Sequence, residues 1–225
     1  MTYLLFLFAV TPPLFLAYLI YKLDRYEKEP VGVCLRVFFY GCLTVIPVII
    51  IEPIVIAFIN SLFFQIFLGV ALVEEYFKFL VVKNYAYKRE SFNEPFDGIV
   101  YAVIASLGFA LVENIGYVFG SAEEEQLFTA IARMFTAIPL HALAGVLMGY
   151  FLGKAKFDKF NEKTLIVKGL LSAIILHTAY DYFLLQDNSN LVIFSFVSLV
   201  VAFYIAKKSI KKSRSRSPFK PNDIH

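Results

Sequence analysis

The chain has 225 residues, of which 59% are hydrophobic and only 17% are charged, and its formal net charge is +3. Soluble domains are far more polar on average, so this composition excludes the soluble globular class. Apolar runs of about 18 or more residues recur along the chain, and each is long enough to cross a bilayer core. The sequence therefore predicts an all-α fold, a polytopic bundle of membrane helices.

About seven membrane-spanning helices are expected. In chain order they cover roughly residues 2–21, 32–58, 61–82, 96–119, 127–152, 165–185 and 190–206. The second contains Pro47, Glu52 and Pro53, so we expect it to be bent or partly re-entrant. In the fifth, Gly145, Gly149 and Gly153 form a stripe of small residues that predicts close contact with another helix.

The basic residues predict the orientation. Lys and Arg gather in the loop 22–36, after the third and fifth expected spans, and beyond residue 206, whereas the loops 120–126 and 186–190 contain none. The positive-inside rule then places the N-terminus outside and the C-terminus inside, which agrees with an odd number of spans. We expect a multi-pass protein of the cell membrane that has the lipid bilayer, and not nucleic acid, as a partner.

Residues 1–206 are interpreted as a single integral membrane domain, and residues 207–225 as a basic cytoplasmic tail that is disordered. Two roles stay open for this tail. It either lies against anionic lipid headgroups or serves only as a topology anchor.

Three charged residues lie inside the third expected span: Glu74, Glu75 and Lys78. Each costs about 2.5–3.5 kcal/mol at the centre of a membrane helix. Lys78 lies four residues after Glu74 and three after Glu75, so it can neutralise a carboxylate on its own helix. The pattern predicts a polar site buried between helices, with a purely structural ion pair as the alternative.

Two histidines, His141 and His177, lie inside later spans at depths compatible with Glu75. Asp181 follows His177 by one helical turn, which allows its carboxylate to orient the imidazole. Glu113 and Asn114 lie in the fourth span, and helix length alone does not decide whether Glu113 reaches the same layer. Arg133 is expected near the outer end of its span, where it pairs with or extends toward Glu123–Glu125 and contacts the substrate.

Buried carboxylates and imidazoles of this kind fit a hydrolase. Glu74 or Glu75 serves as general base, and the sequence does not decide which. Histidine N–H groups or the Asn114 amide stabilise the oxyanion. Alternatively, Glu75, His141 and His177 bind one divalent metal ion such as zinc.

Several motifs succeed one another in a fixed order on successive helices. They are Glu74-Glu75-x-x-Lys78, the segment 96–101, Phe109-x-x-x-Glu113-Asn114, His141, and His177-x-x-x-Asp181. Together they resemble the PrsW family of intramembrane proteases, which belongs with CAAX prenyl endopeptidases and bacteriocin-processing enzymes. In that wider group the second motif usually ends in His, where this chain has Glu113.

The resemblance implies an intramembrane endopeptidase of the bacterial plasma membrane. It implies site-1 cleavage of a single-span anti-sigma factor, with Glu74, Glu75 and His177 at catalytic positions, followed by His141 and Glu113. Three other functions remain open: a non-catalytic scaffold subunit, a proton-coupled transporter, and a CAAX-type protease acting on lipidated peptides. A transporter would show inverted repeats, and the two halves of this sequence show none.

The side of cleavage is a further question. Site-1 cleavage is expected outside the membrane, whereas helix length places Glu75 about 12 Å from the cytoplasmic side. Either the cavity is deep and open outward, or the span boundaries are displaced by a turn or two, or cleavage occurs elsewhere. In each case water must reach the site, so the sequence predicts a polar cavity.

Overall fold

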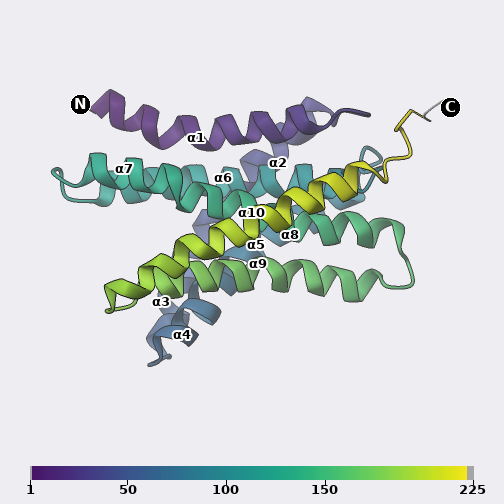
Figure 1. The fold of residues 1–225 in the computed structure, drawn as a ribbon. Coiled ribbons are helices and arrows are strands. Elements are labelled where there is room, and N and C mark those ends of the chain that lie inside the picture. Colours follow the sequence, from purple (N-terminus) through teal and green to yellow (C-terminus); the bar gives the residue numbers. More distant parts are fainter. Residues whose placement is uncertain (1, 222–225) are drawn as a thin grey trace.

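The structure, a computed structural model, describes residues 2–221 (Figure 1), and every regular element in that part of the chain is helical. The α-helices are α1 (Thr2–Leu23), α2 (Val31–Leu43), α3 (Val45–Ala57), α4 (Leu62–Phe64), α5 (Leu72–Asn84), α6 (Asp97–Gly120), α7 (Gln126–Phe135), α8 (Ala137–Phe157), α9 (Glu162–Leu184) and α10 (Val192–Arg214). A π-helical segment, Gln65–Ala71, joins α4 to α5. Short 3₁₀ turns at Ala86–Lys88 and Ser189–Leu191 complete the fold, so the all-α prediction is confirmed.

Six stretches of residues 2–221 are long and apolar enough to cross a membrane. They are Thr2–Leu23, Val31–Ala57, Asp97–Gly120, Gln126–Phe157, Glu162–Leu184 and Ser189–Arg214, which correspond to six of the seven expected spans. The predicted span 61–82 is not among them, because it carries Glu74, Glu75 and Lys78 and is irregular before them. These three residues are buried, so it is neighbouring protein that makes the charges tolerable.

Helix α6 lies at the centre of the bundle, and its residues from Asp97 to Ala110 are all buried. The predicted glycine stripe of α8 packs directly on it. A Cβ at Gly145 would meet the backbone of Val103, and one at Gly149 would meet the backbone of Ile99. The prediction of a close helix contact is confirmed, and this contact fixes the position of His141, one turn before Gly145.

Two long spans are broken. The second is interrupted at Thr44, between α2 and α3, where the Thr44 hydroxyl donates to the Gly41 carbonyl at 2.6 Å. The fifth is interrupted at Thr136, between α7 and α8, where the backbone leaves helical geometry (φ −125°, ψ −78°). Pro139 therefore sits in the first turn of α8, where its missing N–H breaks no intrahelical bond.

The π-helical segment precedes the charged residues of α5. Gln65 closes the turn before it, because its side-chain amide donates to the Ile59 carbonyl at 2.7 Å. Gly69 packs against Ile56 of α3, a contact that leaves no room for a side chain. Since a π-helix changes the angular position of the residues after it, this segment turns Glu74 and Glu75 inward.

The expectation of a disordered tail from residue 207 is wrong for residues 207–214, which continue α10 as regular helix. Lys and Arg are good helix formers, and their long side chains reach away from an apolar helix end. Beyond the helix, Ser217 donates a hydrogen bond to the Glu94 carboxylate. Residues 222–225 of the predicted tail lie outside the described residues.

The beginning of α1 and the end of α10 lie at opposite ends of the bundle (Figure 1). The α6–α7 and α9–α10 connections lie at the same end as the beginning of α1, and the α8–α9 connection lies at the same end as the end of α10.

Candidate active site

Three charged side chains of α5 form the first part of the site. The Lys78 ammonium donates to Oε2 of Glu74 at 2.8 Å and to Oε1 of Glu75 at 2.9 Å. Lys78 and Glu75 are fully buried, and Glu74 is nearly so. The ammonium also lies 4.0 Å from the centre of the Phe109 ring, whose face attracts a cation.

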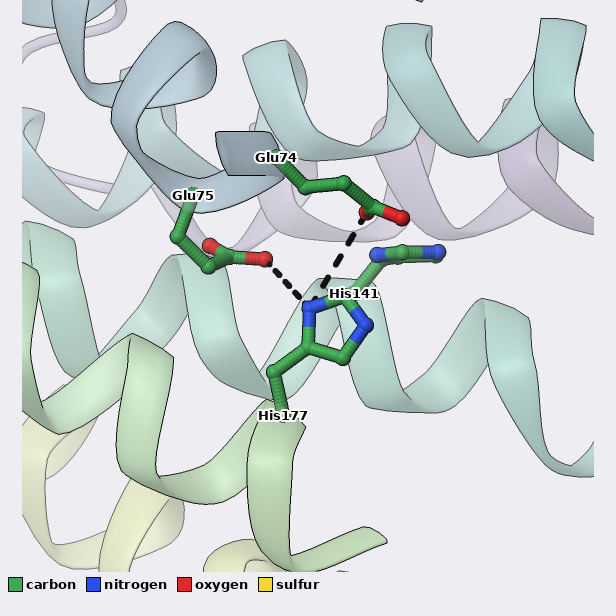
Figure 2. A group of neighbouring side chains, drawn as sticks. All are labelled: Glu74, Glu75, His141 and His177. Atoms are coloured by element: carbon green, nitrogen blue, oxygen red, sulfur yellow. Dashed lines mark hydrogen bonds and ion pairs between the residues drawn. The ribbon is translucent and has the colours of Figure 1, made fainter. Parts of the chain in front are cut away.

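His177 of α9 reaches this group from the opposite side (Figure 2). Its Nδ1 lies 3.0 Å from Oε1 of Glu75 and 3.9 Å from Oε2 of Glu74. Its Nε2 lies 3.1 Å from Oδ2 of Asp181, one turn along the same helix. The carboxylate of Asp181 therefore holds the outer edge of the imidazole and directs Nδ1 toward the glutamates.

His141 of α8 is oriented in the same way. Its Nδ1 lies 3.0 Å from the Lys78 ammonium, and its Nε2 lies 3.0 Å from Oε2 of Glu113. Because an ammonium can only donate, His141 accepts through Nδ1 and donates through Nε2 to Glu113. Both imidazoles thus have a carboxylate behind Nε2 and turn Nδ1 toward α5, and their ring centres are 5.4 Å apart.

Arg133 of α7 forms the outer part of the network. It donates to Glu113 through one terminal nitrogen and to Oδ1 of Asn114 through Nε at 2.9 Å. The expected pairing with Glu123–Glu125 is therefore wrong. Glu113 lies about two turns before the end of α6, and Arg133 lies about two turns after the start of α7, so the short connection brings them to one level.

Asn114 does not join the carboxylates and imidazoles. Its amide nitrogen donates to the Ala9 carbonyl of α1 at 2.9 Å, while its oxygen accepts from Arg133. The side chain is fully buried, and both ends of the amide are in use. Asn114 does not line the cavity beside the carboxylates and imidazoles, so it is a support for Arg133 rather than an oxyanion donor.

A cavity of about 470 Å³ opens beside these residues. Glu74, Glu113, Arg133, His141, His177 and Asp181 line it, whereas Glu75 does not. The rest of its wall comes from α7, the start of α8 and the end of α9, with Val70, Tyr117 and Phe196. The cavity therefore lies toward the end of the bundle that holds the α6–α7 and α9–α10 connections (Figure 1).

The donor set fits a divalent metal ion. Glu74, Glu75, His141 and His177 each offer one ligand atom, and these atoms all lie within 4.8 Å of one another. Imidazole nitrogens and carboxylate oxygens are ligands that zinc accepts, commonly with a carboxylate behind each imidazole. Oε2 of Glu75 is in addition buried without a hydrogen-bond partner.

The charges of the network support the same conclusion. Ion pairs and hydrogen bonds join the carboxyl groups of Glu74, Glu75, Glu113 and Asp181 to the imidazoles and to the cations Lys78 and Arg133. With neutral imidazoles the carboxylates exceed the cations by two charges, which a divalent ion would balance. Moreover, with the His177 proton held on Nε2 by Asp181, the Nδ1 lone pair faces a Glu75 oxygen. These two acceptors repel unless a proton or a metal ion lies between them.

The structure brings together every candidate residue from the sequence except Asn114. Glu113, whose depth helix length left undecided, contacts His141 directly. Sequence reasoning missed that Arg133 belongs to this network. The sequence does hold a signal for this contact. Glu113 and Arg133 lie about equally far, in residues, from the short connection between their two consecutive helices, which places them at the same depth.

Comparison with known proteins agrees with this geometry. A model of the PrsW family of intramembrane metalloproteases matches residues 29–206. A relative named Protease PrsW from Geobacillus kaustophilus is 39% identical over 181 residues, which is 80% of this chain and 79% of the relative. A relative of the same name from Bacillus subtilis is 35% identical, and the match covers 92% of this chain and 94% of the relative. Another from Clostridioides difficile is 30% identical, and the match covers 95% of this chain and 92% of the relative. No solved structure matches this chain.

Proposed function

Because the chain belongs to the PrsW family of intramembrane metalloproteases, we propose that the cavity beside Glu74 is where a peptide bond of a membrane-anchored protein is hydrolysed. The observation that carries this proposal is the convergence of two glutamates and two histidines, with ligand atoms within 4.8 Å, at the wall of a cavity. The family match and the protease relatives favour this function over a scaffold, a transporter or a CAAX-type protease.

Glu75, His141 and His177 are proposed to hold the metal ion, and Glu74 to act as general base. Glu75 is fully buried and does not line the cavity, which suits a ligand, whereas Glu74 faces the space that water and substrate can enter. A bound divalent ion would supply Lewis acidity and a water molecule of lowered pKa. Glu74 takes the proton from the attacking water and later delivers it to the leaving amine.

The remaining polar residues position these groups. Asp181 and Glu113 hold the Nε2 atoms of the two imidazoles, so that each Nδ1 is kept in place. Lys78 offsets part of the negative charge of Glu74 and Glu75 through its two hydrogen bonds. Arg133 holds the Glu113 carboxylate beside His141.

We propose seven crossings with the N-terminus outside and the C-terminus in the cytoplasm. The segment from α4 to α5 would be the seventh, shielded from lipid by its neighbours. The opposite positions of the start of α1 and the end of α10, and the basic residues at the end of α10, support this orientation. With it, the cavity faces the extracytoplasmic side, which suits cleavage at the outer end of a substrate span.

The proposed substrate is a single-span anti-sigma factor cut at site 1. The support is the family match, together with a cavity at the end of the bundle away from the basic tail. The test is to express the protein with each single-span anti-sigma factor encoded in the same genome. We expect one of them to be cut on the extracytoplasmic side of its span. Cleavage confined to cytoplasmic positions would overturn the orientation, and cleavage of unrelated single-span proteins alone would overturn the substrate class.

The catalytic proposal is tested with purified protein and a fluorogenic single-span substrate in liposomes. We expect cleavage by the wild type and by Glu123→Gln, a control in the connection after α6, and none by His177→Ala. A chelator should abolish cleavage, and added zinc should restore it. Cleavage by His177→Ala at the wild-type rate would show that this group is not the active site.

A further inference from the structure

A basic pocket lies at the end of α10, far from the active site. It has a volume of about 410 Å³, and Lys207, Lys211 and Arg214 line it from one face of the helix. Tyr26, from the connection between α1 and α2, and Lys220 also line it. Lys207, Lys211 and Arg214 form no ion pair with any residue in the 2–221 range, and Nε of Arg214 is buried without a partner. The pocket therefore presents unneutralised positive charge.

The acidic groups that interact with Arg214 form no ion pair with it within residues 2–221. Asp24 and Glu94 interact electrostatically with Arg214, but neither residue lines the pocket. The Asp24 carboxylate accepts the backbone N–H of Glu29 at 3.0 Å, and Glu94 accepts from Ser217.

An apolar groove continues from the basic pocket toward the middle of the bundle. It has a volume of about 430 Å³ and lies between α1, α8 and α10, with Val103 of α6 at its base. Leu16, Leu19 and Leu23 form one wall because they share a face of α1. Lys207 and Ile210 line both the groove and the basic pocket, so the two spaces are continuous. The C-terminal ends of α1 and α10 lie at the same end of the bundle (Figure 1).

We propose that this continuous space binds an anionic glycerophospholipid. One acyl chain lies in the groove, and the phosphate of the headgroup accepts hydrogen bonds from Lys207, Lys211 and Arg214. The occupant is inferred from the order of environments along one path: an apolar groove within the membrane that ends in a cluster of cations at the membrane surface. A free phosphate would fill only the pocket, and an apolar helix of another protein would fill only the groove.

The test compares two double variants of α10 that remove equal charge. Lys207→Gln with Lys211→Gln empties the pocket of two cations, whereas Lys208→Gln with Lys212→Gln removes two exposed cations that do not line it. Native mass spectrometry measures the phosphatidylglycerol and phosphatidylcholine retained from mixed micelles. We expect selective retention of phosphatidylglycerol by the wild type and by the second variant, and a loss on the order of tenfold in the first.

A second pair of variants tests the groove. Leu19→Trp fills it, whereas Leu7→Trp places the same side chain on an exposed position of the same helix, away from it. We expect Leu19→Trp alone to weaken retention of phosphatidylglycerol. Equal losses in the two lysine variants would reduce the effect to general surface charge and overturn the proposal.

Two further outcomes would also overturn it. Saturable binding of inorganic phosphate to the wild type, together with no effect of Leu19→Trp on lipid retention, would assign the pocket to free phosphate. A change of oligomeric state in Leu19→Trp, with lipid retention unaltered, would assign the groove to a second copy of the chain.

Discussion

Nδ1 of His177 lies 3.0 Å from Oε1 of Glu75, although 102 positions separate the two residues in the chain. The contact joins α9 to α5 in the interior of the bundle, and Asp181 holds the other nitrogen of the ring. It therefore defines one edge of the proposed metal site. It also distinguishes the surroundings of the two glutamates of α5. Glu75 faces the histidine inside the protein, and Glu74 faces the cavity.

The first prediction separates these two glutamates. Glu75→Gln should lower the zinc content of the purified protein together with cleavage, because it removes a charged ligand. Glu74→Gln should keep the zinc and lower the cleavage rate by about 10²–10⁴-fold, the usual contribution of a general base. Metal analysis and the liposome assay measure the two effects. The opposite pattern, zinc lost in Glu74→Gln and kept in Glu75→Gln, would exchange the two roles.

The second prediction concerns Asp181 as a positioning residue. Asp181→Asn should weaken zinc binding by about 10–100-fold, because a neutral amide holds the His177 imidazole less firmly. Excess zinc should then restore cleavage. Asp187→Asn, in the connection after α9, serves as the control. If Asp181→Asn lowered the melting temperature without changing the zinc dependence, its role would be structural only.

The third prediction tests the pair Arg133 and Glu113. Arg133→Gln leaves a half-buried carboxylate without its cation, so the free energy of unfolding should fall by about 2 kcal/mol. Adding Glu113→Gln should recover part of that loss, because the unpaired charge is gone, while cleavage stays impaired because His141 has lost its carboxylate. Thermal unfolding in detergent measures the stability of the wild type, the two single variants and the double variant. Additive losses in the double variant would mean that the two side chains do not interact.

A fourth prediction links helix packing to the site. Gly149→Ala should push α8 away from α6, because a Cβ there meets the backbone of Gly98 and Ile99. Since His141 is on α8 and Glu113 on α6, cleavage should fall with stability. Gly116→Ala is the matched control, because a Cβ at Gly116 meets no atom within 4 Å. Equal effects of the two substitutions would point to helix flexibility rather than to close packing.

The fifth prediction concerns pH. Burial raises the pKa of Glu29, in the connection between α1 and α2, to about 7, and Tyr101 donates a hydrogen bond to its carboxylate. The folded protein thus binds a proton more tightly than the unfolded chain, whose Glu has a pKa near 4.5. This contribution to stability is complete below pH 4.5 and declines as the pH rises to 7. Glu29→Gln should flatten that decline in unfolding experiments, and an unchanged slope would contradict the assignment.

Several parts of the fold could be predicted from local pattern. Six of the expected spans were predicted because apolar length is a property of consecutive residues. The glycine stripe of α8 was inferred from spacing alone, and it does pack against α6. The irregularity of the second span was also predicted, from its prolines. The sequence did not predict that this irregularity lies at Thr44, nor the break at Thr136 or the π-helical segment, because these depend on how neighbouring helices cross.

The sequence by itself determined that this chain is a membrane bundle and which ionisable residues have no reason to face lipid. That conclusion needs only the free-energy cost of placing a charged side chain in hydrocarbon. This cost depends on the type of residue and not on the tertiary structure. Tertiary structure alone decided how those residues pair. Arg133 turned to Glu113 rather than to the acidic connection, Asn114 turned to α1, and Glu75 rather than Glu74 was enclosed against His177. Such choices depend on the rotation of each helix about its axis, which packing against neighbours sets and local sequence does not.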